Sequence, residues 1–307
     1  MDERDDGPGL GAVLFLAAAV LWGTVGPAQV LAASPMGPAA LGGWRLLGGG
    51  VVLGAFTVTR RKRLRTLASR SVVRPLLVCA LCTGLYQVTF MSAVARTGAA
   101  LATVIALGSV PAATGVCARW INGERVGLAW LVSTAAAVAG CALLLAPGGG
   151  GTRVDALGLL LAVITGACYA LYTVSAKRVV DADPAVDLPT LSALCLLAGS
   201  LMFVPWMVRD AAGLRHGGTA ALIAWLCVAA TAVPYWLYSV GLPRLRGAST
   251  AGTLSLAEPL SAALLGVLLL HERISAPAWA GCGLILGGML VTLCLPAPRA
   301  RIVPSQA

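Results

Sequence analysis

The sequence predicts an all-α integral membrane protein, with ten transmembrane helices arranged as two inverted five-helix repeats around a central cavity. Of its 307 residues 58% are hydrophobic and 11% are charged, against about 25% charged in soluble domains. Apolar stretches of roughly twenty residues, enough to cross about 30 Å of hydrocarbon as a helix, alternate with short basic or Gly/Pro-rich connectors. Landmark residues of the first half recur in the second. The first two observations exclude a water-soluble fold, and the third sets the architecture.

Ten apolar stretches follow one another along the chain. Hydropathy places them at residues 10–31, 36–58, 72–91, 97–118, 127–146, 156–176, 187–208, 219–240, 247–270 and 277–296. An even number of crossings puts both termini on one side of the membrane. If that side is the cytoplasm, inner segments hold about 16 of the 22 Lys and Arg residues and outer segments about five, as the positive-inside rule requires. We therefore expect a multi-pass protein of the plasma membrane with both termini cytoplasmic.

The connecting segments define the domain organisation. We expect an acidic cytoplasmic N-terminus at 1–9, a first repeat at 10–146, a connector at 147–155, a second repeat at 156–296 and a cytoplasmic tail at 297–307. The N-terminus lacks the cationic region of a signal peptide, so the first apolar stretch is expected to be a retained span. The basic run from Arg60 to Arg74 suits a cytoplasmic loop beside anionic headgroups. We therefore expect the lipid bilayer, and no nucleic acid, as a partner.

The nine cysteines do not indicate a metal or cofactor site. Most lie inside apolar stretches, where cysteine behaves as a small hydrophobe. Cys79 and Cys82 have C-x-x-C spacing, but no second ligand pair accompanies them. We therefore expect no metal and no cofactor, and packing roles for these side chains.

Internal repetition is the most informative feature of the chain. The matched residues lie about 148 positions apart, and they are Gly98-Ala99 with Gly247-Ala248, Pro111 with Pro259, Glu124-Arg125 with Glu272-Arg273, Trp130 with Trp279, Gly140 with Gly288, Tyr86 with Tyr235 and Trp22 with Tyr169. Each unit has five spans, so the second copy enters the membrane in the opposite orientation. Inverted repeats exchange roles between two conformations of similar energy, which alternating access to a central site requires. A duplication that only supplies a stable bundle is the alternative.

Short motifs recur in a fixed order over about residues 10–296. They are Trp22-Gly23, Trp44-Arg45-Leu46, Pro111 followed by Gly123-Glu124-Arg125, and Glu258-Pro259 followed by His271-Glu272-Arg273. At these residues the chain resembles the EamA type of the drug/metabolite transporter superfamily. The resemblance implies a basket of ten helices with spans five and ten to one side, and a cavity lined by the other eight. It also implies efflux or exchange of amino acids, metabolites or amphipathic compounds. His271 replaces the family's usual glycine and adds a pH-sensitive side chain near a helix end.

Two ionisable residues fall at membrane depth, where a charge is costly and needs a reason. Glu258 lies about eleven residues into span nine, roughly 16 Å along a helix and close to the midplane. It is a candidate for proton coupling or cation binding; the alternative is a structural group that satisfies backbone freed by Pro259. Arg45, in span two, is a candidate to hold a substrate carboxylate or to pair with Glu258. Its alternative is a side chain that extends to the outer interface. Neighbouring glycines at 42, 43 and 48–50 allow close helix packing around it.

Aromatic and amide side chains at mid-span complete the candidate site. Such residues give an apolar cavity with a few polar groups, the usual composition of a small-molecule site, although packing explains each of them equally well. They are Trp22, Tyr86, Gln87, Phe90, Tyr169, Tyr172, Tyr235 and Tyr238. Pro111 and Pro259, at matched depths, are predicted to kink their helices and are candidate hinges; inherited bends are the alternative. Glu124 and Glu272, beside arginines at helix ends near opposite faces of the membrane, are expected to form local ion pairs; a gating role is the alternative.

These patterns favour a secondary active transporter of a small molecule. We expect an exporter of amino acids, metabolites or amphipathic drugs that works by alternating access, with protons as a candidate coupling ion. The alternative is an intramembrane enzyme or lipid-modifying protein, which needs a polar catalytic cluster. The sequence has no H-E-x-x-H, no G-x-S-x-G and no P-loop, and neither His216 nor His271 falls mid-span. We therefore expect no enzymatic activity.

Overall fold

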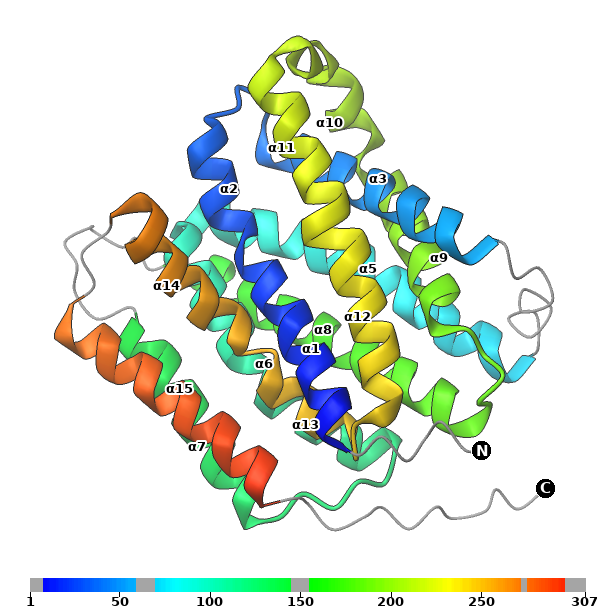
Figure 1. The fold of residues 1–307 in the computed structure, drawn as a ribbon, viewed down its shortest axis with the longest axis vertical. Helices are drawn as coiled ribbons and strands as arrows, with labels where there is room; N and C mark the ends of the chain where they lie inside the picture. Colours follow the sequence, from blue (N-terminus) through cyan, green and yellow to red (C-terminus); the bar gives the residue numbers. More distant parts are fainter. Residues whose placement is uncertain (1–7, 59–69, 145–154, 272–274, 296–307) are drawn as a thin grey trace.

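The computed structural model describes residues 8–58, 70–144, 155–271 and 275–295, and every regular element in these ranges is helical (Figure 1). The first half comprises α1 (Pro8–Gly23), α2 (Val25–Ala32), α3 (Pro38–Val58), α5 (Arg70–Thr97), α6 (Ala99–Ile121) and α7 (Leu128–Leu144). The second half comprises α8 (Ala156–Ala182), α9 (Leu188–Ser200), η2 (Leu201–Phe203), α10 (Val204–Arg209), η3 (Ala211–Arg215), α11 (Gly217–Cys227), η4 (Val228–Ala232), α12 (Val233–Gly241), η5 (Leu242–Arg244), α13 (Ala248–Leu254), α14 (Ala257–Leu270) and α15 (Ala276–Cys294).

These elements form the ten transmembrane helices that hydropathy predicts. Within the described ranges, nine continuous or nearly continuous helices are long and apolar enough to cross a membrane, and α7 is a shorter apolar helix of 17 residues. The helix α7 packs antiparallel against α15, since Gly140 meets Gly281 while Ser133 meets Gly288. A Cβ added at Gly140 would lie 2.7 Å from the carbonyl oxygen of Gly281, so the two backbones almost touch. Spans five and ten therefore form a separate pair at one side of the bundle (Figure 1).

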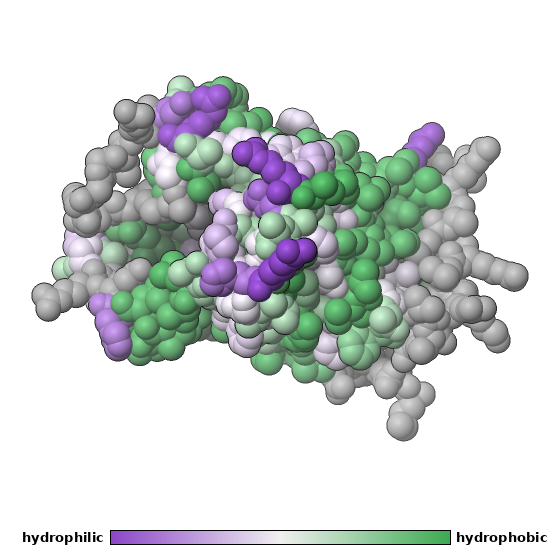
Figure 2. All heavy atoms as spheres, turned by 90° about the horizontal axis from the view of Figure 1, so that it is seen from above, coloured by the Kyte–Doolittle hydropathy of each residue, from purple (hydrophilic) through white to green (hydrophobic). Residues whose placement is uncertain are grey.

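The outer surface of the bundle is apolar, as a lipid-facing surface must be. Large hydrophobic side chains point outward, among them Phe56 and Leu128, which are 75% and 76% exposed. Trp120 and Trp279 are exposed near helix ends, where indole rings suit the membrane interface. Figure 2 looks onto the end of the molecule that carries the connection from α10 to α11. Hydrophilic residues gather on that face, and hydrophobic ones dominate around it.

The two ends of the bundle can be told apart by where the chain begins and ends. The start of α1 lies beside η5, because a Cβ at Gly11 would fall 2.7 Å from the Cβ of Arg244. The last turn of α15 lies beside the start of α7, as their antiparallel packing requires. The end of the bundle that holds the start of α1 and the last turn of α15 is called the termini end, and the opposite one the far end (Figure 1). At the far end the amide of Gly37 donates to Asp210 (3.0 Å).

Several spans are interrupted near the middle of the bundle, which hydropathy averages over and does not predict. The first span breaks at Thr24, between α1 and α2, and the ninth breaks at Ser255 and Leu256, between α13 and α14. Pro259 has no N–H to donate four residues back, and the carbonyl of Ser255 accepts from the amide of Glu258 instead (3.0 Å). The helix α6 runs unbroken through Pro111. The two prolines that match in the repeat therefore lie in differently built helices.

The glycines of α3 bring this helix close to the second half, as the sequence predicts. A Cβ at Gly43 would lie 2.7 Å from the Cβ of Phe203, and one at Gly49 would lie 2.7 Å from the Cβ of Thr231. Gly48 packs against Cys227 in the same way. Close packing of these glycines against the second half fixes the rotation of α3 about its own axis. The face of α3 that carries no part of this contact therefore points toward the centre of the bundle.

Candidate functional site

A cavity lies between the two halves, with about 610 Å³ of space free of protein atoms, part of which opens to the outside. Its walls are formed by Trp22, Arg45, Leu46, Cys82, Thr83, Tyr86, Gln87, Cys168, Tyr169, Tyr172, Tyr235, Tyr238 and Glu258. These residues come from α1, α3 and α5 of the first half and from α8, α12 and α14 of the second. Each half thus supplies three helices to one shared space.

The structure brings together all but one of the side chains that the sequence nominates for substrate binding. Phe90 is the exception: it stacks on the outer side of Tyr86, with ring centroids 6.1 Å apart, and packs among the small side chains of Ala93 and Ala162. Sequence reasoning missed Leu46, Cys82, Thr83 and Cys168. Helical spacing was the available signal, because Cys82 and Thr83 lie one turn before Tyr86 and Gln87, and Leu46 and Cys168 adjoin nominated residues.

The aromatic wall of the cavity follows the internal repeat. Trp22 and Tyr169 are matched in the two halves, as are Tyr86 and Tyr235, and all four line the cavity. Trp22 meets Tyr235 edge to face, with centroids 5.4 Å apart and planes at 73°. Tyr172 meets Tyr235 at 88°, with centroids 6.4 Å apart. Such edge-to-face contacts hold the rings in fixed orientations.

The polar groups of the aromatic side chains around the cavity differ in their hydrogen bonding. Those of Tyr172 and Tyr238 are bonded inside the protein: Tyr172 shares a 2.9 Å hydrogen bond with Ser192, and Tyr238 donates to Thr173 (3.1 Å). Their rings face the cavity while their polar atoms hold neighbouring helices. The hydroxyl of Tyr169 and the indole Nε1 of Trp22 are buried and have no hydrogen-bond partner in the described part of the chain. Both are unsatisfied polar groups of residues that line the cavity.

The two charged residues of the cavity are Arg45 and Glu258. They interact electrostatically, yet no ion pair within 4 Å joins them among the residues that the structure describes. The Nε of Arg45 is buried without a hydrogen-bond partner in those same ranges. The repeat register places Ser192 opposite Arg45 and Ser109 or Val110 opposite Glu258. Ser109 donates to Ala106 (2.8 Å), so it needs no partner from the cavity. The charges are therefore the asymmetric part of a nearly symmetric site.

Glu258 is positioned by the meeting of two interrupted helices. It lies in the first turn of α14, directly after the break in span nine. Gly23, just before the break in span one, packs over this turn: a Cβ there would lie 2.7 Å from the carbonyl oxygen of Glu258. The hydroxyl of Ser261 donates to the same carbonyl (2.9 Å) and approaches that of Val20 (3.4 Å). The Trp22-Gly23 motif thus places an indole in the cavity and leaves room for α14 beside it.

Glu124 lies outside the cavity and does not form the expected ion pair with Arg125. Its carboxylate instead accepts hydrogen bonds from the amides of Ala248 (2.7 Å) and Ser249 (3.2 Å) and from the hydroxyl of Ser249 (2.7 Å). These groups begin α13 in the second half, so the interaction is long-range in sequence and was not visible to local pattern reasoning. Arg125 is exposed. The expected ion pair of Glu272 lies outside the described residues.

The fold defines a polytopic helical membrane protein with a cavity at the interface of inverted repeats. The EamA-like transporter family matches the chain twice, over residues 9–146 and 156–294. The chain belongs to this family, and it is a membrane transporter of the drug/metabolite transporter superfamily.

Similar proteins carry transporter names and are not named as enzymes. The uncharacterized transporter YwfM of Bacillus subtilis is 34% identical over 93% of this chain and 94% of its own length. The threonine/homoserine exporter RhtA of Escherichia coli is 32% identical over 56% of each chain. One solved crystal structure, 22% identical, shares the fold with a TM-score of 0.76 and covers 93% of this chain and 96% of its own.

Proposed function

We propose that this protein is a secondary active transporter of the plasma membrane that exports amino acids, related metabolites or amphipathic compounds by alternating access. The observation that carries the proposal is the pair Arg45 and Glu258, two opposite charges that face one cavity without neutralising each other. Burial of a charged side chain is costly unless a ligand pairs with the charge or a proton neutralises it. Zwitterionic solutes fit this arrangement best.

The polar groups of the cavity supply both ends of a zwitterion. A solute carboxylate is matched by the guanidinium of Arg45, which binds carboxylates with two parallel hydrogen bonds. The unpartnered Nε1 of Trp22 and hydroxyl of Tyr169 add further donors beside it. A solute ammonium is matched by the Glu258 carboxylate, and the aromatic wall accommodates an apolar side chain.

Alternating access is supported by the helices that meet at the cavity. Transporter sites commonly lie near the membrane midplane, at the interface of inverted repeats and beside interrupted helices. Here spans one and nine both break next to cavity residues, Trp22 in one and Glu258 in the other. The hinge role of Pro259 is part of this proposal, because the break precedes it, and Pro111 is proposed as a weaker hinge within a continuous helix.

The solute class and direction also draw on one relative. RhtA is named as an exporter of threonine and homoserine, and it aligns with 56% of this chain. Both solutes named there are small amino acids, with the carboxylate and ammonium groups that this cavity matches. We propose protons as the coupling ion, because Glu258 has the chemistry to exchange one, and cytoplasmic termini from the distribution of basic residues.

Transport by purified protein in liposomes tests this function. Vesicles loaded with a panel of amino acids, including threonine and homoserine, are diluted into unlabelled buffer with and without a pH gradient. We expect efflux of at least one zwitterionic solute that the pH gradient accelerates. Glu258→Gln should remove the effect of the gradient, while Asp183→Asn, in an exposed loop, serves as a matched control. If no zwitterion in the panel is transported while amphipathic cations are, the proposed solute class is wrong.

A further inference from the structure

We propose that Glu124 is a releasable latch between the two repeats: its carboxylate holds the start of α13 while the termini end of the transport pathway is closed, and releases it when that end opens. The inference rests on the proposed alternating access. It concerns a residue that neither lines the cavity nor contacts a solute, so Glu124 acts as a positioning residue for the conformational step.

The contact itself joins the halves through one side chain. Glu124 belongs to the connection between α6 and α7 of the first repeat, and it is 9% exposed. Both carboxylate oxygens are used by the second repeat, one by the amide of Ala248 and the other by the amide and hydroxyl of Ser249. Gly247 leaves the space, since a Cβ there would lie 2.6 Å from the Oε2 of Glu124. Three donors aimed at one carboxylate form a specific contact.

The latch acts on the segment that leads to the cavity. The helix α13 continues through the break at Ser255 and Leu256 into α14, whose first turn carries Glu258. An interruption at this point lets α13 move relative to α14 at a lower cost than bending a continuous helix. Holding the start of α13 therefore also restricts the movement of the segment that leads to Glu258.

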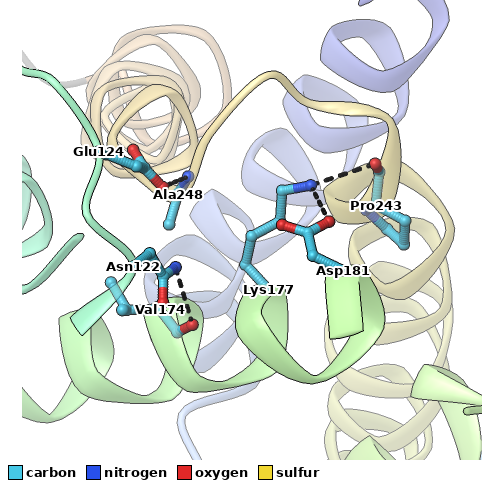
Figure 3. A network of polar contacts seen from close by, with 7 residues as sticks. All are labelled: Asn122, Glu124, Val174, Lys177, Asp181, Pro243 and Ala248. Carbon is cyan, nitrogen blue, oxygen red and sulfur yellow. Dashed lines mark hydrogen bonds and ion pairs between the residues drawn. The ribbon is translucent and has the colours of Figure 1, made fainter. Parts of the chain in front are cut away.

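Other contacts gather around the latch at the termini end (Figure 3). Asn122 donates to the carbonyl of Val174 (3.3 Å), which ties the end of α6 to α8. Lys177, 4% exposed, donates to Asp181 (2.7 Å) and to the carbonyl of Pro243 (3.3 Å), which ties α8 to η5. The ends of four elements from both repeats are thus fastened together in this conformation.

The internal repeat indicates that this fastening is not permanent. Gly98-Ala99 is the counterpart of Gly247-Ala248 at the opposite end of its span, and inverted repeats exchange their conformations during transport. Gly98 precedes α6 with a φ of +85°, whereas Gly247 precedes α13 with a φ of −164°. The two matched helix starts therefore differ in backbone conformation. Water at the exposed neighbours Gly123 and Arg125 can replace the carboxylate's hydrogen bonds on release.

Thiol labelling of the native cavity tests the latch without knowledge of the solute. Cys82 and Cys168 line the cavity, and a membrane-impermeant maleimide added from either side reports which end is open. Labelled peptides are quantified by mass spectrometry, and a Cys82→Ala/Cys168→Ala variant identifies them. Glu124→Gln should raise the ratio of labelling from the termini side to labelling from the far side by about fivefold or more, because it removes charge-assisted hydrogen bonds.

Two further variants separate a latch from a folding role. Gly247→Ala leaves the carboxylate intact but displaces it, and should shift the ratio in the same direction. Ser249→Ala removes one of three donors and should give a smaller shift in a stably folded protein. Asp183→Asn should leave the ratio unchanged. Lower thermal stability of Glu124→Gln and Ser249→Ala with an unchanged labelling ratio would show a purely structural contact and overturn the latch.

The outcomes also distinguish the latch from the proposed function. A shifted ratio in a protein that transports none of the tested solutes would support the latch and count against the proposed solutes. An unchanged ratio in variants that still show pH-driven efflux would overturn the latch and leave the transport function in place.

Discussion

Arg45 of α3 and Glu258 of α14 face the same cavity from opposite halves of the protein and do not form an ion pair within 4 Å in the described structure. Paired charges would neutralise each other and leave little for a solute. Separated charges instead create two subsites of opposite sign in an aromatic cavity. The predictions below test what each charge does and what holds the site in place.

Replacement of Arg45 should discriminate between solutes. Arg45→Ala removes the guanidinium that matches a carboxylate, so uptake of carboxylate-bearing solutes should fall by about tenfold or more, and analogues that lack the carboxylate, such as amino-acid amides, should be affected much less. Liposome counterflow with matched acid and amide pairs measures the difference. Equal losses for both members of a pair would indicate a structural arginine that extends to the interface.

Replacement of Glu258 should uncouple transport from protons. Glu258→Gln keeps the size of the side chain and one acceptor oxygen but has no titratable proton. We expect pH-driven efflux to be lost, whereas counterflow between equal solute concentrations should persist with weaker solute binding, because the amide oxygen can still accept a hydrogen bond from the solute ammonium but carries no charge. Thermal unfolding in detergent serves as the folding control. Retention of the full pH response in this variant would rule out a coupling role and favour the structural alternative.

Gly23 should be intolerant of any side chain. A Cβ there would lie 2.7 Å from the carbonyl oxygen of Glu258 and 3.0 Å from the amide of Ala262, so Gly23→Ala forces α1 away from α14. Overpacking of this kind costs about 1–3 kcal/mol. Gly26 provides a matched control in the same span, because a Cβ there would meet nothing within 4 Å. Thermal melts should show a clear loss for Gly23→Ala and none for Gly26→Ala.

Asp155 should contribute stability that depends on pH. It begins α8, where its carboxylate accepts from the amide of Gly158 (3.0 Å) and pairs with Arg96 (3.2 Å). The Gly158 hydrogen bond, and secondarily Arg96, lower the pKa of this carboxyl below its usual value. A lowered folded-state pKa gives stability that is present above the unfolded pKa and is lost as the pH falls through the folded one. Asp155→Asn should therefore reduce the melting temperature slightly at pH 7, and this reduction should become smaller as the pH falls below about 4. A similar decrease at neutral and at acidic pH would exclude a role for the charge.

The cavity lining shows which site residues could be predicted from the sequence. Depth in a span and the internal repeat were sufficient to nominate Trp22, Tyr169 and Tyr235, because a residue's distance along a helix gives its depth in the bilayer. Depth and helix face alone did not distinguish Tyr86, which lines the cavity, from Phe90, which lies one turn further along the same face of α5. That distinction depends on where along α5 the cavity ends, which packing between helices decides.

Glu124 shows the limit of local reasoning more clearly. In the sequence it adjoins Arg125, and an ion pair between neighbours was the simplest expectation. In the structure it bonds Ala248 and Ser249, more than a hundred residues away, because folding brings the α6–α7 connection against the start of α13. No propensity or motif carries that information.

By itself, the sequence determined that this protein crosses the membrane ten times and that its halves are inverted copies, and it predicted that Arg45 and Glu258 lie at membrane depth. It could do so because the bilayer imposes a fixed thickness and requires each span to satisfy its own backbone hydrogen bonds, and both constraints are local. Only the tertiary structure decided which faces of the helices meet, where spans one and nine break, and which groups have no partner. Those features arise from contacts between helices distant in sequence, where a single glycine such as Gly23 sets the closest approach.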